Sequence, residues 1–236
     1  MSEAKPRGYF EQSSDLTNSL ILVAPLVLLY ELGLIITNFQ SLNGVDFGTI
    51  LVLRYGGFRG LIGFNLAILL GMSLAALLRR RERSFRAEIV PLVLIESTFY
   101  AFVAGIAVSV IVDALPLGPP ADFTPLQGFF ASLGAGVNEE LFFRVGLYQT
   151  LVLVLARGKK DRQAACLIAA VLSSVVFSGA HYLGGEKFAV ASFLDRFLFG
   201  LLFCGLFEWR GFAITVYTHA IFDIYVLVVL PLLKPH

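Results

Sequence analysis

Seven long apolar segments limit what this chain can fold into more than any other feature of its sequence. They occupy residues 20–37, 60–78, 89–112, 126–155, 164–183, 188–207 and 212–233. A helix of about 20 apolar residues crosses the roughly 30 Å hydrocarbon core of a bilayer. Because 57% of the residues are hydrophobic and only 15% are charged, we predict an all-α, polytopic membrane helical bundle with about seven transmembrane helices.

These segments divide the chain into a short tail and one membrane domain. Residues 1–17 are polar and predict an N-terminal tail that is flexible or lies on the surface, whereas residues 18–236 are predicted to form a single membrane-embedded helical domain. Residues 38–58 are rich in glycine and are predicted to form a loop. The first apolar run has no small-residue cleavage site at its end, so we expect it to remain as a membrane span.

The fourth apolar segment is too long for a simple span. As one helix at 1.5 Å per residue, residues 126–155 would extend about 45 Å, which exceeds the ~30 Å core. The segment must therefore tilt, break or extend beyond the membrane, and a break would raise the expected number of helices to eight.

Two basic clusters, at residues 79–86 and 157–162, set the expected orientation of the chain. Lys and Arg are enriched in cytoplasmic loops, so both clusters are predicted to be cytoplasmic, with the N-terminus inside and the C-terminus outside. This topology favours a multi-pass protein of the bacterial inner membrane. The net charge of +1 gives no reason to expect a nucleic-acid partner. Cys166 and Cys204 lie in apolar runs without a CxxC pattern and are predicted to be buried thiols.

The most unusual stretch is residues 138–144, Asn-Glu-Glu-Leu-Phe-Phe-Arg, which places three charges inside the fourth apolar segment. A charge near the bilayer centre costs about 2.5–3.5 kcal/mol, so such residues are rare and usually functional. In an α-helix, Glu140 and Arg144 would share a face and pair. Glu139 would be turned about 100° away from Glu140, which leaves its carboxylate available for chemistry.

The helix face that carries Glu139 is otherwise made of small residues, namely Ser132, Ala135, Gly136 and Gly146. Small residues in a membrane helix indicate either close packing against another helix or room for a substrate backbone. Close packing alone does not account for a carboxylate on this face, so we favour the second interpretation.

Both internal histidines lie in apolar segments. His219 has Asp223 four residues later, the spacing at which a carboxylate can fix the tautomer of an imidazole. His181 has Phe177 one turn earlier, where the two rings can pack together. Measured from the expected inner ends of their helices, His181 lies about 26 Å and His219 about 11 Å along the helix. The two depths agree only if the fifth helix tilts strongly, enters late or breaks near Gly179.

These residue types are suited to the hydrolysis of a peptide bond, which needs an activated water and a stabilised oxyanion. Glu139 is the candidate base, His181 and His219 can hold the water or donate to the oxyanion, and Asp223 can orient His219. No cofactor is favoured. Zinc is the alternative, because two histidines and a carboxylate also make a zinc shell, and its ligands would be Glu139, His181, His219 and Asp223. The sequence has no HExxH motif.

The three motifs Glu139-Glu140-x-x-x-Arg144, Phe177-x-x-x-His181 and His219-x-x-x-Asp223 occur in this order on successive segments. In this they resemble the CPBP family, the CAAX protease and bacteriocin-processing (Abi) family, which includes CAAX prenyl endopeptidases of the Ras-converting type. The resemblance places a catalytic core at about residues 126–225.

The resemblance implies an intramembrane endopeptidase with a conical cavity open to membrane and water, acting on a membrane protein or lipidated peptide. It implies that Glu139 activates the water with support from Glu140 and Arg144, and that a glutamate mechanism is favoured over a metalloprotease. It also implies that His181 and His219 are catalytic. Asp223 stands where the family has Asn or Asp, and Asn is the form in the prenyl-protein enzymes. Bacterial members include processors of C-terminal sorting tails, of the myxosortase type, and bacteriocin-related proteins.

Two other classes of function compete with a protease. A proton-coupled transporter would relay ions through the same acids and histidines, but the sequence shows no inverted repeat of the kind expected for it. A non-catalytic immunity or scaffold protein would not need all three motifs. Four further charged residues lie in apolar segments outside the motifs: Glu31, Glu96, Asp195 and Arg196. Of these, Asp195 and Arg196 are candidates to pair across helices or to line a cavity.

Overall fold

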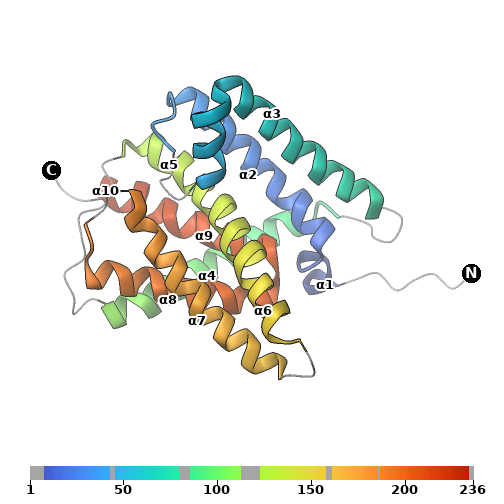
Figure 1. Cartoon of the computed structure of the whole chain (residues 1–236), viewed down its shortest axis with the longest axis vertical. Coiled ribbons are helices and arrows are strands. Elements are labelled where there is room, and N and C mark those ends of the chain that lie inside the picture. Colours follow the sequence, from blue (N-terminus) through green and yellow to red (C-terminus); the bar gives the residue numbers. More distant parts are fainter. Residues whose placement is uncertain are drawn as a thin grey trace, which may run out of the picture.

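Helices make up most of the described chain, in which no strand occurs (Figure 1). The computed structural model describes residues 8–42, 46–79, 86–112, 123–157, 161–184 and 187–233. The elements in chain order are α1 (Tyr9–Ser13), α2 (Leu16–Ile36), α3 (Phe47–Arg79), α4 (Ile89–Val112), α5 (Pro125–Gly134), η2 (Ala135–Tyr148), α6 (Gln149–Leu155), α7 (Arg162–Ala180), η3 (His181–Gly184), α8 (Val190–Arg210), α9 (Phe212–Ile224), η4 (Tyr225–Val229) and α10 (Leu230–Leu233).

Five of these helical stretches are long and apolar enough to cross a membrane: Leu16–Ile36, Ile89–Ile111, Arg162–Leu183, Val190–Arg210 and Phe212–Leu233. They correspond to the first, third, fifth, sixth and seventh predicted segments. The predicted second segment lies within α3, and the fourth is the continuous stretch formed by α5, η2 and α6. The prediction of an all-α membrane helical bundle is confirmed, and the chain is an integral membrane protein.

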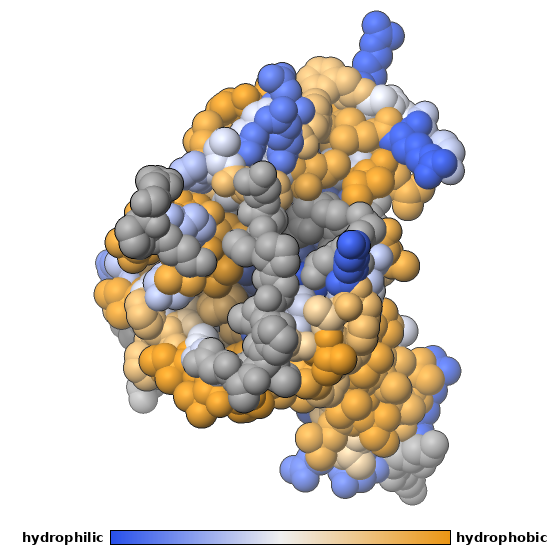
Figure 2. All heavy atoms as spheres, turned by 90° about the vertical axis from the view of Figure 1, so that its left-hand side faces the viewer, coloured by the Kyte–Doolittle hydropathy of each residue, from blue (hydrophilic) through white to orange (hydrophobic). Residues whose placement is uncertain are grey.

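The surface of the bundle is apolar over large areas, as a membrane protein requires. Large hydrophobic side chains such as Leu70, Val110 and Leu183 are more than two-thirds exposed. Figure 2 shows hydrophobic residues spread over the face it presents, with hydrophilic residues in separate groups toward its upper and lower ends and near its middle. Exposed leucine, valine and phenylalanine on this scale would be a liability in water, but they match the lipid of a bilayer.

Helix α9 is the centre of the bundle. Every residue from Phe212 to Ala220 is buried, and α9 packs against α2, α4, α5, α8 and η2. The largest buried apolar cluster joins α9 to residues of α2, α4 and α5. Any side chain that α9 presents to η2 therefore lies deep inside the protein, and His219 is one of these.

The segment predicted as the long fourth helix does not break, but it changes its hydrogen-bonding pattern. Thr124 and Gln127 form a capping box at its start, with Pro125 at the first helical position, as expected for a helix N-terminus. From Ala135 to Tyr148 the chain is a π-helix. π-helical stretches are rare and occur frequently at functional sites, and this one contains all three charges of the fourth segment.

The predicted loop at residues 38–58 is largely wrong. Helix α3 already begins at Phe47, and Gly57 is its only residue with non-helical backbone angles, with φ 58° and ψ −160°. Glycine takes such angles without a steric cost. The segment is apolar, and in lipid a backbone satisfies its hydrogen bonds by forming a helix, which outweighs the weak helix propensity of glycine.

The expected orientation in the membrane depends on segments that lie mostly outside the described residues. Residues 80–85 and 158–160 of the two basic clusters, and residues 113–122 of the expected outer loop, are not among them. The topology with both clusters in the cytoplasm stays a prediction.

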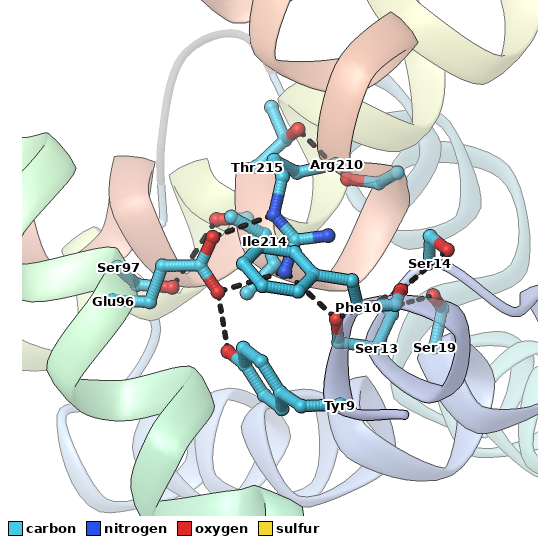
Figure 3. Close-up of polar contacts among 11 residues, drawn as sticks. Tyr9, Phe10, Ser13, Ser14, Ser19, Glu96, Ser97, Arg210, Ile214 and Thr215 are labelled. Atoms are coloured by element: carbon cyan, nitrogen blue, oxygen red, sulfur yellow. Dashed lines mark hydrogen bonds and ion pairs between the residues drawn. The ribbon is translucent and has the colours of Figure 1, made fainter. Parts of the chain in front are cut away.

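Of the predicted N-terminal tail, residues 8–15 lie against the bundle, and Leu16 and Thr17 already belong to α2. Helix α1 lies against the α8–α9 turn, where Arg210 binds Glu96 through Nε at 2.5 Å and through Nη2 at 2.8 Å, and Nη2 also donates to Ser13 Oγ at 2.9 Å (Figure 3). The hydroxyl of Tyr9 donates to Glu96 as well, and the guanidinium lies 4.4 Å from the ring centre of Phe10. Burial and the neighbouring Glu96 carboxylate hold the pKa of Tyr9 above its usual range, so this hydroxyl keeps its proton.

Candidate active site

Three helical segments bring together the six residues singled out in the sequence. Glu139, Glu140 and Arg144 lie on η2, His219 and Asp223 on α9, and His181 at the first position of η3, directly after α7. The α-helix of the fifth segment thus ends at Ala180, beside Gly179. A break near Gly179 was one of the three arrangements that the sequence allowed for bringing the two histidines to the same depth. Glu139, Glu140, Arg144 and His219 are all buried.

The Glu139 carboxylate faces both imidazoles. Its Oε1 is 3.9 Å from His181 Nε2, and its Oε2 is 3.8 Å from His219 Nε2. Both distances are too long for direct hydrogen bonds, but a polar gap of this size suits a bridging water molecule. The side chain of Glu139 is only 2% exposed, whereas those of His181 and Asp223 are 17% and 22% exposed, so the more accessible edge of the gap is the one formed by His181 and Asp223.

The tautomer of His181 follows from its backbone contact. His181 Nδ1 lies 3.0 Å from the carbonyl oxygen of Phe177. A carbonyl oxygen only accepts hydrogen bonds, so Nδ1 carries the proton and the neutral ring presents the lone pair of Nε2 to the gap. The Phe177 ring lies edge-on to the His181 ring at 5.2 Å, which confirms the packing expected from their spacing.

The two nitrogens of His219 face different carboxylates. Nδ1 donates to Glu140 Oε1 at 2.7 Å, and Nε2 lies 3.5 Å from Asp223 Oδ2 and 3.8 Å from Glu139. The His219 ring is also stacked on Phe203, with 4.7 Å between centres and 22° between planes. The sequence suggested that Asp223 orients His219, and the structure shows Glu140 to be the shorter contact.

Arg144 compensates the buried charge of Glu140. Its Nε lies 3.1 Å from Glu140 Oε2, and its Nη2 donates to the Gly200 carbonyl at 3.4 Å. The guanidinium also lies between two rings, 4.4 Å from the centre of Phe177 and 5.3 Å from that of Phe203. Such cation–π contacts stabilise a desolvated arginine. Glu140 therefore joins Arg144 to His219, a link that the i, i+4 spacing of Glu140 and Arg144 does not reveal.

The small residues near Glu139 do not share one role. A Cβ atom on Gly136 would lie 2.8 Å from the Val216 carbonyl oxygen and 2.9 Å from Ala220 Cβ, so Gly136 is where η2 packs closely on α9. A Cβ on Gly146 would meet nothing closer than 3.5 Å. At Gly136 the packing interpretation is therefore correct, and the substrate-space interpretation favoured from the sequence is wrong.

The zinc alternative for this site stays a prediction. Within the described ranges, no group of three or more His, Cys, Asp or Glu side chains has the arrangement of a metal-binding set. The bond from His219 Nδ1 to Glu140 leaves Nε2 facing Glu139 and Asp223, which is compatible with either chemistry. We derive no chemical step through a metal.

The other charged residues of the apolar segments differ in how near they lie to the site, and Asp195 is close enough to Asp223 for the two charges to interact. Glu96 binds Arg210 at the far end of α8. The guanidinium of Arg196 lies 5.6 Å from the ring centre of Tyr182, the residue after His181, and Asp195 is half-buried on α8. Both cysteines were predicted to be buried thiols. Cys204 is buried and Cys166 is half-buried, and both are free cysteines.

The fold and the site define a class of protein, an integral membrane bundle that buries a glutamate between two histidines. Residues 121–225, a little under half of the chain, match the family model of the type II CAAX prenyl endopeptidase Rce1-like proteins. The matched region contains all six residues of the site. No curated protein and no solved structure matches the chain. The family match supports intramembrane endopeptidase activity on a membrane-associated protein or peptide.

Proposed function

We propose that this protein is a glutamate-type intramembrane endopeptidase that cleaves a membrane-anchored protein or lipidated peptide with a water molecule activated by Glu139. The observation that carries the proposal is the position of the Glu139 carboxylate, 3.8–3.9 Å from the Nε2 atoms of two histidines. The bacterial inner membrane is the proposed location, and the processing of a C-terminal tail or a leader is the proposed task.

In this mechanism, Glu139 removes a proton from the water, and the resulting hydroxide adds to the scissile carbonyl carbon. The lone pair of His181 Nε2 accepts a hydrogen bond from the attacking water and orients it, and the protonated ring of His219 donates its Nε2–H to the oxyanion of the tetrahedral intermediate. The carbon–nitrogen bond then breaks as Glu139 returns its proton to the leaving amine. Both products leave with the atoms of one water molecule added, and Glu139 is restored as a carboxylate.

The surrounding residues hold the histidines and balance the charge. Glu140 keeps the Nδ1 proton of His219 directed away from the substrate, and Arg144 compensates Glu140. Asp223, close to Nε2 of His219, favours the protonated ring when the oxyanion develops. Burial excludes bulk water, which strengthens these interactions.

Mass spectrometry of membrane-protein termini in cells tests the proposal. Cells that express the wild-type chain should release new C-termini or N-termini that are missing in cells that express Glu139→Gln at the same level in the membrane. Identical termini in the two strains would contradict a protease and favour a non-catalytic immunity or scaffold role.

A further inference from the structure

The candidate base is attached to a part of the chain that the family match does not reach. Asp46 lies directly before α3, is only 2% exposed, and precedes the matched residues 121–225. Its Oδ2 accepts hydrogen bonds from the Tyr30 hydroxyl at 2.6 Å and from Asn138 Nδ2 at 3.1 Å. Its Oδ1 accepts the backbone N–H of Thr49 at 3.1 Å. Asn138 is the residue immediately before Glu139.

Through Asn138, Asp46 binds the π-helix η2, and the rotation of this helix about its own axis decides where its side chains point. In a π-helix the backbone bonds run from i to i+5, so the direction of each side chain differs from that in an α-helix. Neighbouring residues still diverge by roughly a quarter turn, close to the 100° of an α-helix. Fixing the Asn138 side chain on the α2–α3 side therefore fixes the direction in which Glu139 points.

Tyr30 holds the same stretch one turn earlier. A Cβ atom on Gly134 would lie 2.2 Å from Tyr30 Cε2, so the tyrosine ring lies directly on the helix backbone. The hydroxyl of the same ring donates to Asp46. Tyr30 and Asp46 together thus contact the helix at Gly134 and Asn138, just before the candidate base.

Capping of α3 explains only one oxygen of this carboxylate: Oδ1 accepts the Thr49 N–H as an N-cap side chain does, and Oδ2 is left to bind Tyr30 and Asn138. Burial raises the pKa of Asp46, which shows that the ionised group is costly at this position, and among the described residues no Lys or Arg pairs with it. A carboxylate oxygen is, however, an acceptor for two donors at once. That is the property needed to hold Tyr30 and Asn138 together.

We propose that Asp46, with Tyr30, is a positioning residue for catalysis: through Asn138 it sets the orientation of η2 and so aims Glu139 at the space between His181 and His219. The expected effect on kcat rests on the proposed function, whereas the expected effect on the orientation of η2 does not. The N-terminal helices then complete the frame of a site whose reacting groups all lie within the family region.

The test compares Asp46→Leu and Asp46→Asn in the full-length protein, in detergent or liposomes, with a membrane-anchored peptide as substrate. Leucine has the same number of side-chain heavy atoms as aspartate but is bulkier and has no acceptor, and the Asp15→Leu control below carries the same increase in bulk. We expect it to lower kcat by about 10- to 100-fold with KM nearly unchanged, because a small misplacement of a catalytic group has effects of this size. Asparagine keeps one acceptor oxygen for Tyr30 and Asn138 and should restore most of kcat.

Asp15 supplies a matched control. It is 6% exposed and accepts the backbone N–H groups of Thr17 and Asn18 at the start of α2. Asp15→Leu removes a comparably buried carboxylate and should leave kcat within about twofold. A loss of kcat as large as that of Asp46→Leu would reduce the role of Asp46 to general stability and overturn the proposal.

A double-mutant cycle tests the link itself. If Asp46 acts through Asn138, then Asp46→Leu combined with Asn138→Leu should lower kcat no more than the worse of the two single variants. Losses that multiply would show independent action and contradict the link, as would kcat values for both single variants within threefold of the wild type.

Hydrogen exchange separates a failure of this inference from a failure of the proposed function. Without any substrate, Asp46→Leu should speed amide exchange in residues 134–144 relative to both the wild type and Asp15→Leu, because an anchor of the helix is lost. A wild-type protein that cleaves nothing would contradict the protease alone. Unchanged exchange in Asp46→Leu would overturn the positioning role whatever the activity.

Discussion

At the scale of single residues, Glu140 has two partners. One carboxylate oxygen receives the Nδ1 proton of His219, and the other faces Arg144. Both Glu140 and Arg144 are fully buried. A buried ion pair contributes little net stability, but removal of one partner leaves the other charge without compensation. Glu140 therefore couples the integrity of the bundle to the orientation of a candidate catalytic histidine.

Glu140→Gln is expected to destabilise the protein by about 3–5 kcal/mol, the range for breaking a buried pair, because Arg144 would remain buried and charged. Thermal unfolding in a mild detergent measures this loss. Glu208→Gln is the matched control, since its pair with Arg162 is largely exposed and such pairs contribute little. Equal unfolding temperatures for the two variants would argue against the compensating role of Glu140.

At the scale of secondary-structure elements, the site depends on how closely η2 approaches α9. The approach is possible because Gly136 has no side chain where it meets the backbone at Val216 and Ala220. Glu139 lies three residues after Gly136, and His219 lies between the two α9 contacts. The separation of the two helices at this glycine therefore sets the distance between the candidate base and one of its histidines.

Gly136→Ala should push the two helices apart, with a stability cost of about 1–3 kcal/mol from overpacking and a fall in kcat on the order of 100-fold. Cleavage kinetics and thermal unfolding of the same preparation give both values. Gly205→Ala is the control, because a Cβ on Gly205 meets no atom within 4 Å. Full activity in Gly136→Ala would mean that this close approach does not position the site.

Local periodicity explains how much of these elements could be predicted from the sequence. The apolar segments and the spacing of the motifs follow from it, and so does the pairing of Glu140 with Arg144. The π-helical register from Ala135 to Tyr148 does not, because the choice between i+4 and i+5 bonds depends on packing against α9. For the same reason the sequence could not assign Gly136 to packing or reveal that Glu140 binds His219, 79 residues away.

At the scale of the whole molecule, the chain is joined by polar contacts between distant segments. Arg210, at the end of α8, binds Glu96 of α4 and Ser13 of α1, and Asp46 binds Asn138 across 92 residues. The polar composition of residues 8–17 predicts a tail, because nothing in the local sequence indicates that α1 would contact the buried side chain of Arg210. Contacts of this length in sequence are visible only in three dimensions.

Arg210→Met is predicted to destabilise the bundle by about 3–5 kcal/mol, because Glu96 would lose its partner. The double variant Glu96→Met, Arg210→Met should recover most of this loss, since an apolar replacement of a whole buried pair is often close to neutral. Thermal unfolding of the three proteins measures it. A double variant less stable than Arg210→Met would contradict this account of how α1, α4 and α8 are held together.

The central claim, that the Glu139 carboxylate activates the water, is tested most directly by single-turnover cleavage of a membrane-anchored peptide in proteoliposomes, with and without a strong metal chelator. We predict that the wild type cleaves at the same rate in both conditions and that Glu139→Gln is slower by about 10²–10⁴-fold, the usual contribution of a general base. An active Glu139→Gln variant, or a wild type that chelation silences and zinc restores, would contradict it.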